Sequence, residues 1–204
     1  MHVIAGVYAP VAGHLDFAGQ QGVSFANPRA AQQAGVATVY QERSLFSHLT
    51  VAENLFAGHV PHPAWVRIDH GRMRSEAKRL LDEVGLDVSP DARVENLAPD
   101  QQQMVEIAKA LSRELKLIIF DEPTAALSEH ETATLFRVIR LLRERGVGVI
   151  YISHRLEEIF GLADRVTVLK DGRKQATCEV CATNPEELVR LMIGRDLPHR
   201  DREV

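Results

Sequence analysis

The sequence predicts an α/β fold with a mainly parallel, doubly wound sheet. Three short, almost wholly apolar runs end abruptly in polar residues: 35–40 (GVATVY), 115–123 (LKLIIFDEP) and 147–152 (VGVIYI). Such runs are typical of strands that are buried on both faces of a parallel sheet. Helical patterns lie between successive runs, and this alternation favours parallel pairing, with ligands bound at the carboxyl ends of the strands.

The composition excludes several functional classes. The chain has 204 residues, which is enough for one domain with a sizeable core. Its 24 basic and 28 acidic residues give a net charge of −4, which argues against a nucleic-acid binder that works through a positive field. Two cysteines and no amino-terminal signal pattern favour a reducing, cytosolic setting. No apolar run approaches about 18 residues, so any membrane contact would come through a partner.

The first third of the chain is predicted to hold two short strands and a short helix. The amino-terminal segment looks like the end of an apolar element, followed by a Gly/Pro turn and a short strand at 14–17. Residues 35–40 form the first buried strand, 51–58 a short helix, and 59–69, which contain prolines, a loop.

Three amphipathic helices are predicted in the middle of the chain, at 72–84, 101–115 and 129–145. Gly85 and Gly146 follow the first and third of these and are suitable residues for ending a helix. The apolar residues at helical spacing are Ala77, Leu80, Leu81 and Val84 in the first helix and Met104, Ile107, Ala108 and Leu111 in the second.

The last part of the chain is predicted to form a hairpin, a helix and a tail. Residues 165–173 (RVTVLKDGR) indicate a strand that runs into a hairpin turn at Asp171 and Gly172. Residues 185–193 indicate a short helix, and 195–204 a charged, frayed tail.

Four polar side chains are expected to gather at the carboxyl edge of the sheet. Gln41 follows the first strand, and His154 follows the third. Asp121 and Glu122 end the middle strand, where one carboxylate can hold Mg²⁺ and the next can polarise an attacking water. A histidine can contact a γ-phosphate or that water. Taken alone, the acids also fit a helix amino terminus that favours negative charge, and His154 also fits a core histidine.

Three ordered stretches resemble the ATPase domain of ABC transporters: 39–55 (VYQERSLFSHLTVAENL), 101–127 (QQQMVEIAKALSRELKLIIFDEPTAAL) and 146–173 (GVGVIYISHRLEEIFGLADRVTVLKDGR). Within that family, QQQMVEIAKAL and YISHRLEEIF are similar to the first ATPase half of ribose, galactose and xylose-type sugar importers. The resemblance implies a P-loop NTPase-like fold in which 1–204 is one domain, with a helical signature subdomain at about 59–115.

The resemblance also implies roles for single residues. Gln41 matches the Q-loop glutamine, which reaches Mg²⁺ or the attacking water and relays to the membrane subunit. Asp121 matches the Walker B aspartate near Mg²⁺, Glu122 the catalytic glutamate, and His154 the switch histidine. Two further sets match nucleotide-contacting motifs, the signature motif at Leu97, Ala98, Pro99, Asp100 and Gln101 and the D-loop at Ala126, Leu127 and Ser128.

Two departures from the family pattern bear on activity. The phosphate loop, G-x-x-x-x-G-K-[ST], is absent, since none of the five lysines follows a glycine. MHVIAGVY resembles the end of the helix after that loop, so we expect Met1 to lie just downstream of it, in a truncated form that also lacks the preceding strands. In the signature motif, Ala98 replaces a serine, Pro99 has no N–H group, and Asp100 places a carboxylate where the partner's ATP would bind. The same stretch also suits a plain helix start, with Asp100 favouring the dipole.

The function implied by the resemblance is the ATPase subunit of a carbohydrate importer, with ATP and Mg²⁺ as ligands. The implied partners are a second ABC ATPase domain, membrane permease subunits and, indirectly, a sugar-binding protein, with no nucleic acid. The implied location is the cytoplasmic face of the membrane. A catalytically dead regulatory partner of an intact ATPase is the main alternative. ABC proteins of DNA repair or translation, which usually carry basic or coiled-coil inserts, and P-loop kinases fit less well.

Overall fold

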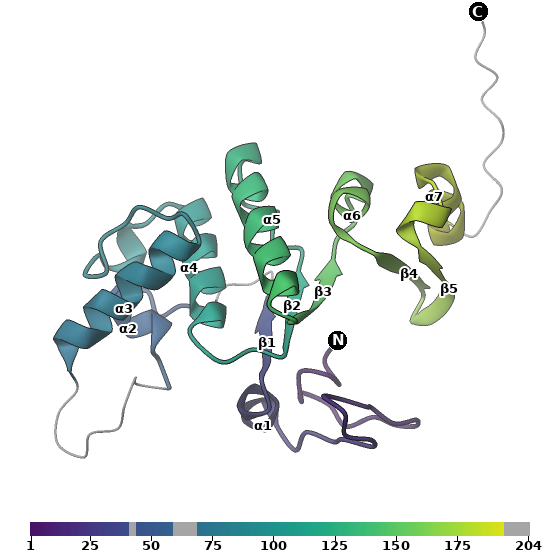
Figure 1. Ribbon diagram of the computed structural model, residues 1–204, viewed down its shortest axis with the longest axis horizontal. Helices are drawn as coiled ribbons and strands as arrows, with labels where there is room; N and C mark the ends of the chain where they lie inside the picture. The colour runs from purple at the N-terminus through teal and green to yellow at the C-terminus, as the bar shows by residue number, and fades with distance from the viewer. Residues whose placement is uncertain (41–43, 59–68, 194–204) are drawn as a thin grey trace, which may run out of the picture. The chain divides into compact units, whose positions relative to one another are not determined.

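The computed structural model describes residues 1–40, 44–58 and 69–193 (Figure 1). The chain divides into two compact units, Met1–Ile152 and Ser153–Val204. Gln41 and the predicted tail at 195–204 lie outside the described residues. Across the described ranges, no helix combines the length and apolar character that a bilayer span requires.

The first unit is built around a three-stranded parallel sheet in the order β1-β2-β3. Its register pairs Val39 with Phe120 and Asp121 with Ile152, so the carboxyl ends of the strands lie at one edge. The predicted parallel sheet is therefore confirmed. The strands cover β1 Val36–Val39, β2 Leu117–Asp121 and β3 Gly148–Ile152.

The middle strand β2 carries the core of this unit. Ile118, Ile119 and Phe120 are completely buried, and burial of each such side chain contributes about 1.5–3 kcal/mol. Ile119 clusters with Val36 and with Ala31 of helix α1 (Pro28–Gln33). Partly buried apolar residues pack against this cluster, several of them from the amino-terminal segment: Met1, Ile4, Phe17, Phe25, Leu117, Ile150 and Ile152.

Three helices of the first unit pack on one another: α2 (Val51–Leu55), α3 (His70–Glu83) and α4 (Pro99–Leu111), and α4 also contacts β1. The predicted apolar stripes are buried in both longer helices, except that Leu111 is only half-buried. Helix α3 ends where Gly85 adopts a φ of +69°, as expected for a glycine that terminates a helix. The proposed limits of a helical subdomain, about 59–115, stay a prediction.

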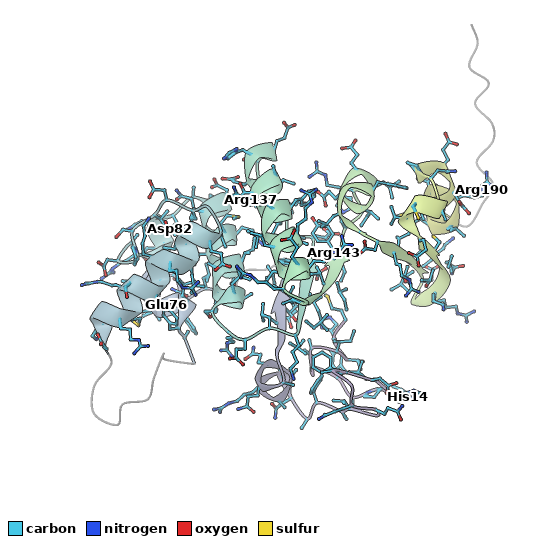
Figure 2. All side chains as sticks on the ribbon, in the orientation of Figure 1. His14, Glu76, Asp82, Arg137, Arg143 and Arg190 are labelled. Carbon is cyan, nitrogen blue, oxygen red and sulfur yellow. The ribbon has the colours of Figure 1, made fainter. Side chains whose placement is uncertain are left out.

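Charged side chains cover the solvent side of α3. Glu76 and Asp82, labelled in Figure 2, form ion pairs with Arg79 (2.7 Å) and Lys78 (2.9 Å). The paired residues are one helical turn apart and their side chains are 39–59% exposed, so each pair contributes only a few tenths of a kcal/mol. The helix therefore depends mainly on its buried stripe.

Helix α5 (Glu129–Glu144) follows β2 and contacts β3. It begins at Ser128, whose hydroxyl accepts the Glu131 N–H while the Glu131 carboxylate accepts the Ser128 N–H and hydroxyl, a capping box. Gly146, at φ +78°, ends it. The prediction of 129–145 is confirmed to within one residue.

The second unit contains an antiparallel hairpin, helix α6 (Leu156–Leu162) and helix α7 (Pro185–Ile193), which packs on the hairpin. The hairpin strands are β4 (Arg165–Lys170) and β5 (Arg173–Glu179). Asp171 and Gly172 both adopt positive φ at the turn, as a two-residue hairpin of this kind requires. The predicted hairpin and last helix are confirmed.

One predicted element is wrong, and several elements of the structure were not predicted. The expected strand at 14–17 is wrong, because glycines at positive φ, Gly13, Gly19 and Gly22, fold this segment into turns with only an isolated bridge between Phe17 and Gln20. Helices α1 and α6 were not predicted, although Asn27 followed by Pro28 is a recognisable helix start. Short 3₁₀ turns, also not predicted, occur at Val94–Asn96 and Val180–Ala182.

Candidate functional site

The acid pair lies at the carboxyl end of the central strand, as the sequence predicted. Asp121 is the last residue of β2 and lies opposite Ile152 of β3. The N–H of Glu122 donates to the Ile152 carbonyl (2.9 Å), which extends the sheet by one more hydrogen bond. Both acidic residues are half-buried. Two consecutive acidic residues are thus placed at the edge where parallel α/β sheets bind ligands.

The backbone at Glu122 is strained. Its φ is +47°, in the left-handed region that a residue with a Cβ atom rarely adopts. This conformation costs a non-glycine residue about 1–2 kcal/mol. Strain of this kind persists where the surroundings enforce it, and it concentrates at functional sites.

The predicted D-loop forms a tight turn between the acid pair and α5. The Ala125 N–H donates to the Glu122 carbonyl (3.3 Å), and the Leu127 N–H donates to the Thr124 carbonyl (3.1 Å). Ala126 and Ser128 are exposed, and Leu127 is half-buried. Ser128 therefore has a structural role as the cap of α5, whatever else it contacts.

The predicted signature stretch is the beginning of α4. Leu97 and Ala98 precede the helix, Pro99 is its first residue, and Asp100 and Gln101 belong to its first turn. The Gln101 side chain accepts the Ala98 N–H (3.1 Å), and Pro99 has no N–H to offer. Of the backbone N–H groups that a helix start usually presents to an anion, that of Ala98 is therefore already hydrogen-bonded and that of Pro99 does not exist.

Asp100 adds a negative charge at the same helix start. A hydrogen bond with the Glu131 side chain, helped by the backbone of Gln101 and of Asp100 itself, holds the pKa of Asp100 below its usual range. The contact links the first turn of α4 to the capping box of α5. Sequence reasoning missed Glu131 in this position, although the Ser128-x-x-Glu131 spacing is a visible capping signal.

The remaining two candidates, His154 and Gln41, do not belong to the described part of the first unit. His154 is exposed and belongs to the second unit, where it lies between Ser153 and Arg155 just before α6. Gln41 lies outside the described residues; the strand that precedes it ends level with Phe120 of β2. The convergence of all four side chains on one ligand therefore stays a prediction.

The acid pair suits a magnesium ion that is held jointly with a ligand. Mg²⁺ prefers oxygen ligands and is usually bound by one or two carboxylates together with substrate phosphates and water. Asp121 and Glu122 supply hard oxygen donors of this kind. Among the described residues no cluster of three or more His, Cys, Asp or Glu could form a complete protein cage. The donor set thus fits a nucleotide-bound ion.

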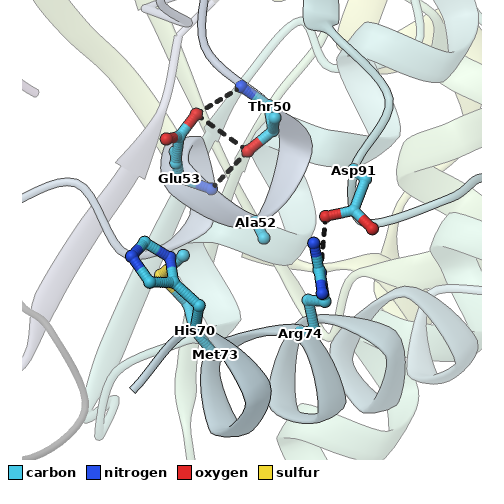
Figure 3. A pocket seen from close by; sticks show the side chains of 7 residues that line it. All are labelled: Thr50, Ala52, Glu53, His70, Met73, Arg74 and Asp91. Carbon is cyan, nitrogen blue, oxygen red and sulfur yellow. Dashed lines mark hydrogen bonds and ion pairs between the residues drawn. The ribbon is translucent and has the colours of Figure 1, made fainter. Parts of the chain in front are cut away.

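A small cavity between α2 and α3 does not compete as a nucleotide site (Figure 3). Its volume is about 160 Å³, below the 300–1,000 Å³ that is typical of ligand pockets. Its polar groups also bind one another, since the Glu53 carboxylate accepts hydrogen bonds from the Thr50 N–H and hydroxyl, and Arg74 pairs with Asp91 at 2.7 Å.

Comparison with known proteins identifies ABC transporter ATP-binding proteins as relatives. The family profile described as "ABC transporter" matches residues 1–125. A ribose import ATP-binding protein of Rubrobacter xylanophilus is 48% identical over 212 aligned residues, which include the whole of this chain and 41% of that protein. An arabinose import ATP-binding protein of Pectobacterium atrosepticum is 46% identical, over 97% of this chain and 39% of that protein. The chain thus spans about two fifths of the length of these relatives.

Solved structures share the fold. An ATP-binding cassette of an ABC transporter in an ADP conformation matches with a TM-score of 0.76 and 23% identity, over 95% of this chain and 82% of the other. A nucleotide-free cassette from an ABC transporter matches with a TM-score of 0.75 and 22% identity, over 96% and 78% of the two chains. At this level of identity the likeness concerns the fold.

Proposed function

This chain belongs to the ABC transporter ATP-binding family, and from that premise we propose that it is the ATPase part of a carbohydrate importer. The proposal is supported by the relatives named for ribose and arabinose import. It is also supported by the pair Asp121 and Glu122 at the carboxyl end of the buried central strand. This pair is the observation that carries the proposal.

In the proposed reaction, water attacks the γ-phosphate of ATP in line with the departing ADP. Glu122 lies one residue beyond the strand and acts as the group that orients the water and accepts its proton. Asp121 would hold a magnesium ion, which when bound would neutralise charge on the phosphates. His154 contacts the γ-phosphate, and Gln41 senses the same site and relays its state to the membrane subunit.

The proposed assembly is a head-to-tail pair of ATPase domains on the cytoplasmic face of the membrane. Each ATP would lie between one domain's acid pair and the other domain's signature motif. Permease subunits bind the pair and transmit its closure, and a sugar-binding protein delivers the substrate to the permease. The net charge of −4 disfavours nucleic acid as a partner.

We expect the 204-residue polypeptide to bind ATP weakly by itself. None of its five lysines stands in a G-x-x-x-x-G-K-[ST] motif, and in P-loop proteins the backbone and lysine of that motif hold the phosphates. Titration calorimetry with Mg-ATP measures this directly. A dissociation constant in the micromolar range for the isolated chain would refute the expectation.

Hydrolysis by Glu122 is tested in a chimera that places a phosphate-loop segment of an ABC ATPase ahead of Met1. The change Glu122→Gln should lower its ATP turnover by about 10²–10⁴-fold, the usual contribution of a general base, while leaving ATP affinity intact. The matched control is Glu144→Gln, at an exposed position near the end of α5. Equal turnover of the two variants would remove Glu122 from the mechanism.

The start of α4 favours a second candidate, a silent partner that regulates an intact ATPase. With Ala98 already bonded to Gln101, Pro99 lacking an N–H and Asp100 negatively charged, this signature stretch is poorly suited to a partner's γ-phosphate. In a mixture with an intact homologue, Pro99→Gly with Asp100→Gly should then raise the homologue's turnover, and Glu122→Gln should leave it unchanged. Loss of turnover on Glu122→Gln would favour the ATPase instead.

A further inference from the structure

We propose that Glu158 is a positioning residue that fixes the backbone on both sides of His154. The inference rests on the proposed function, in which His154 contacts the γ-phosphate. Glu158 lies in the first turn of α6 and is only 4% exposed, whereas His154 itself is exposed. No step of the proposed hydrolysis uses this buried carboxylate, so its burial requires another explanation.

The contacts of Glu158 go to the two neighbours of His154. The hydroxyl of Ser153 donates to Glu158 Oε2 (2.7 Å), and the guanidinium of Arg155 pairs with Glu158 Oε1 through Nη1 (2.9 Å). The backbone N–H of Arg155 in turn donates to Ser153 Oγ (3.0 Å). Ser153, Arg155 and Glu158 thus form a closed ring of contacts, and the Ser153–Arg155 hydrogen bond in this ring spans His154 alone.

This ring differs from an ordinary helix cap. In a capping box the carboxylate at the third helical position accepts the N–H of the cap residue. Here the cap residue is Arg155, its N–H binds the Ser153 hydroxyl, and Glu158 accepts that hydroxyl. The hydrogen bonds of Glu158 therefore reach beyond the cap residue to Ser153, two positions before it. They restrain the φ and ψ angles of His154, which lies between Ser153 and Arg155.

The energetic cost of the buried carboxylate supports a specific role. An ionised carboxylate that is removed from water needs charge and hydrogen-bond partners for both of its oxygens. Both oxygens of Glu158 have a partner, Ser153 on Oε2 and Arg155 on Oε1. An apolar side chain at this position would be buried without this desolvation cost. We therefore attribute the presence of the carboxylate to its hydrogen bonds, which orient the segment that carries the His154 imidazole.

The test is nuclear magnetic resonance relaxation on the full 204-residue chain, without nucleotide. In the wild type, the His154 amide should have an order parameter of about 0.85, which is typical of rigid backbone, and Glu158→Ala should lower it below about 0.6. Glu158→Gln keeps an acceptor for the Ser153 hydroxyl and should restore most of the order. Glu157→Ala, one position away on the exposed side of α6, is the matched control and should change nothing. The His154 imidazole signals, recorded in the same samples, should move toward those of an unstructured peptide in Glu158→Ala alone.

Thr167 in β4, which hydrogen-bonds Thr177 in β5, reports on the fold of the second unit. Loss of order at His154 with unchanged Thr167 signals supports the proposal. If Glu158→Ala unfolds the unit, Ser153→Ala decides, because it removes only the hydroxyl. Unchanged order at His154 in these variants, or equal loss at Thr167 and His154 in both of them, would overturn the proposal. Since no nucleotide is involved, this result is independent of the hydrolysis test on Glu122.

Discussion

Strain at Glu122 makes a quantitative prediction about stability. The residue adopts φ +47°, a conformation that costs a side-chain-bearing residue about 1–2 kcal/mol and costs glycine nothing. Glycine also gains freedom in the unfolded chain, which offsets about 0.5–1 kcal/mol of that relief. Glu122→Gly should therefore be more stable than Glu122→Ala by about 1 kcal/mol, because both variants lose the carboxylate and differ only in the Cβ atom.

Hydrogen exchange measures this difference within the first unit. The amides of Ile119 and Phe120 lie in the fully buried central strand and exchange only when the unit opens extensively. A difference of about 1 kcal/mol corresponds to about five-fold slower exchange in Glu122→Gly than in Glu122→Ala. The control is Ala125→Gly in the same turn, where φ is not positive, so glycine should lower stability there. Equal protection in the two Glu122 variants would show that the backbone at this position is unstrained.

Three further changes test the supporting structure. Ser128→Ala removes the cap of α5 and should lower the free energy of unfolding by about 0.5–2 kcal/mol in urea denaturation; an unchanged midpoint would contradict the capping box. Glu106→Ala removes the buried carboxylate that accepts the Ser44 N–H (2.5 Å) and should cost about 1.5–3 kcal/mol. It should also speed exchange of the Ser44 amide, whereas Glu106→Gln, which keeps an acceptor, should not. Hydrogen bonds from the backbone and hydroxyl of Thr50 hold the pKa of Glu53 below its ordinary value of 4.5. The ionised form thus stabilises the fold above that pH, and the contribution is lost as the pH falls through the lowered pKa. Below pH 4.5 the wild type should lose stability more steeply than Glu53→Gln, and parallel stability curves would exclude this contribution.

Elements with strong periodicity could be predicted from the sequence. Residues 117–120 are all apolar and are followed directly by the two acids, and β2 is fully buried at Ile118, Ile119 and Phe120. Helix α5 begins after a capping signal and ends before a glycine, so both of its ends are encoded locally. The amino-terminal segment lacks such periodicity. Its glycines adopt positive φ and form turns. The short apolar pattern at 14–17 does not reveal these turns, because the same pattern also occurs in strands.

The candidate site was predictable only in part, because motifs identify residues but not their distant contacts. The positions of Asp121 and Glu122 follow from where the strand ends. The strain at Glu122 does not, since nothing in a Glu residue signals a positive φ. The contact between Asp100 and Glu131 joins two helix starts that are thirty-one positions apart in the chain, so local patterns carry no information about it.

The two acids that are buried among the described residues, Glu106 in α4 and Glu158 in α6, share a further property. Glu106 lies between the buried apolar residues Val105 and Ile107, and helical periodicity alone would favour an apolar side chain there. Each acid accepts a hydrogen bond from a serine within three positions of a candidate site residue, Ser44 three positions after Gln41 and Ser153 directly before His154. Sequences depart from simple burial rules mainly at functional or strained sites. We therefore explain the burial of each carboxylate, despite its desolvation cost, by the backbone segment that it fixes through the serine. A buried acid that is hydrogen-bonded to a serine near a site residue can thus indicate a positioning role.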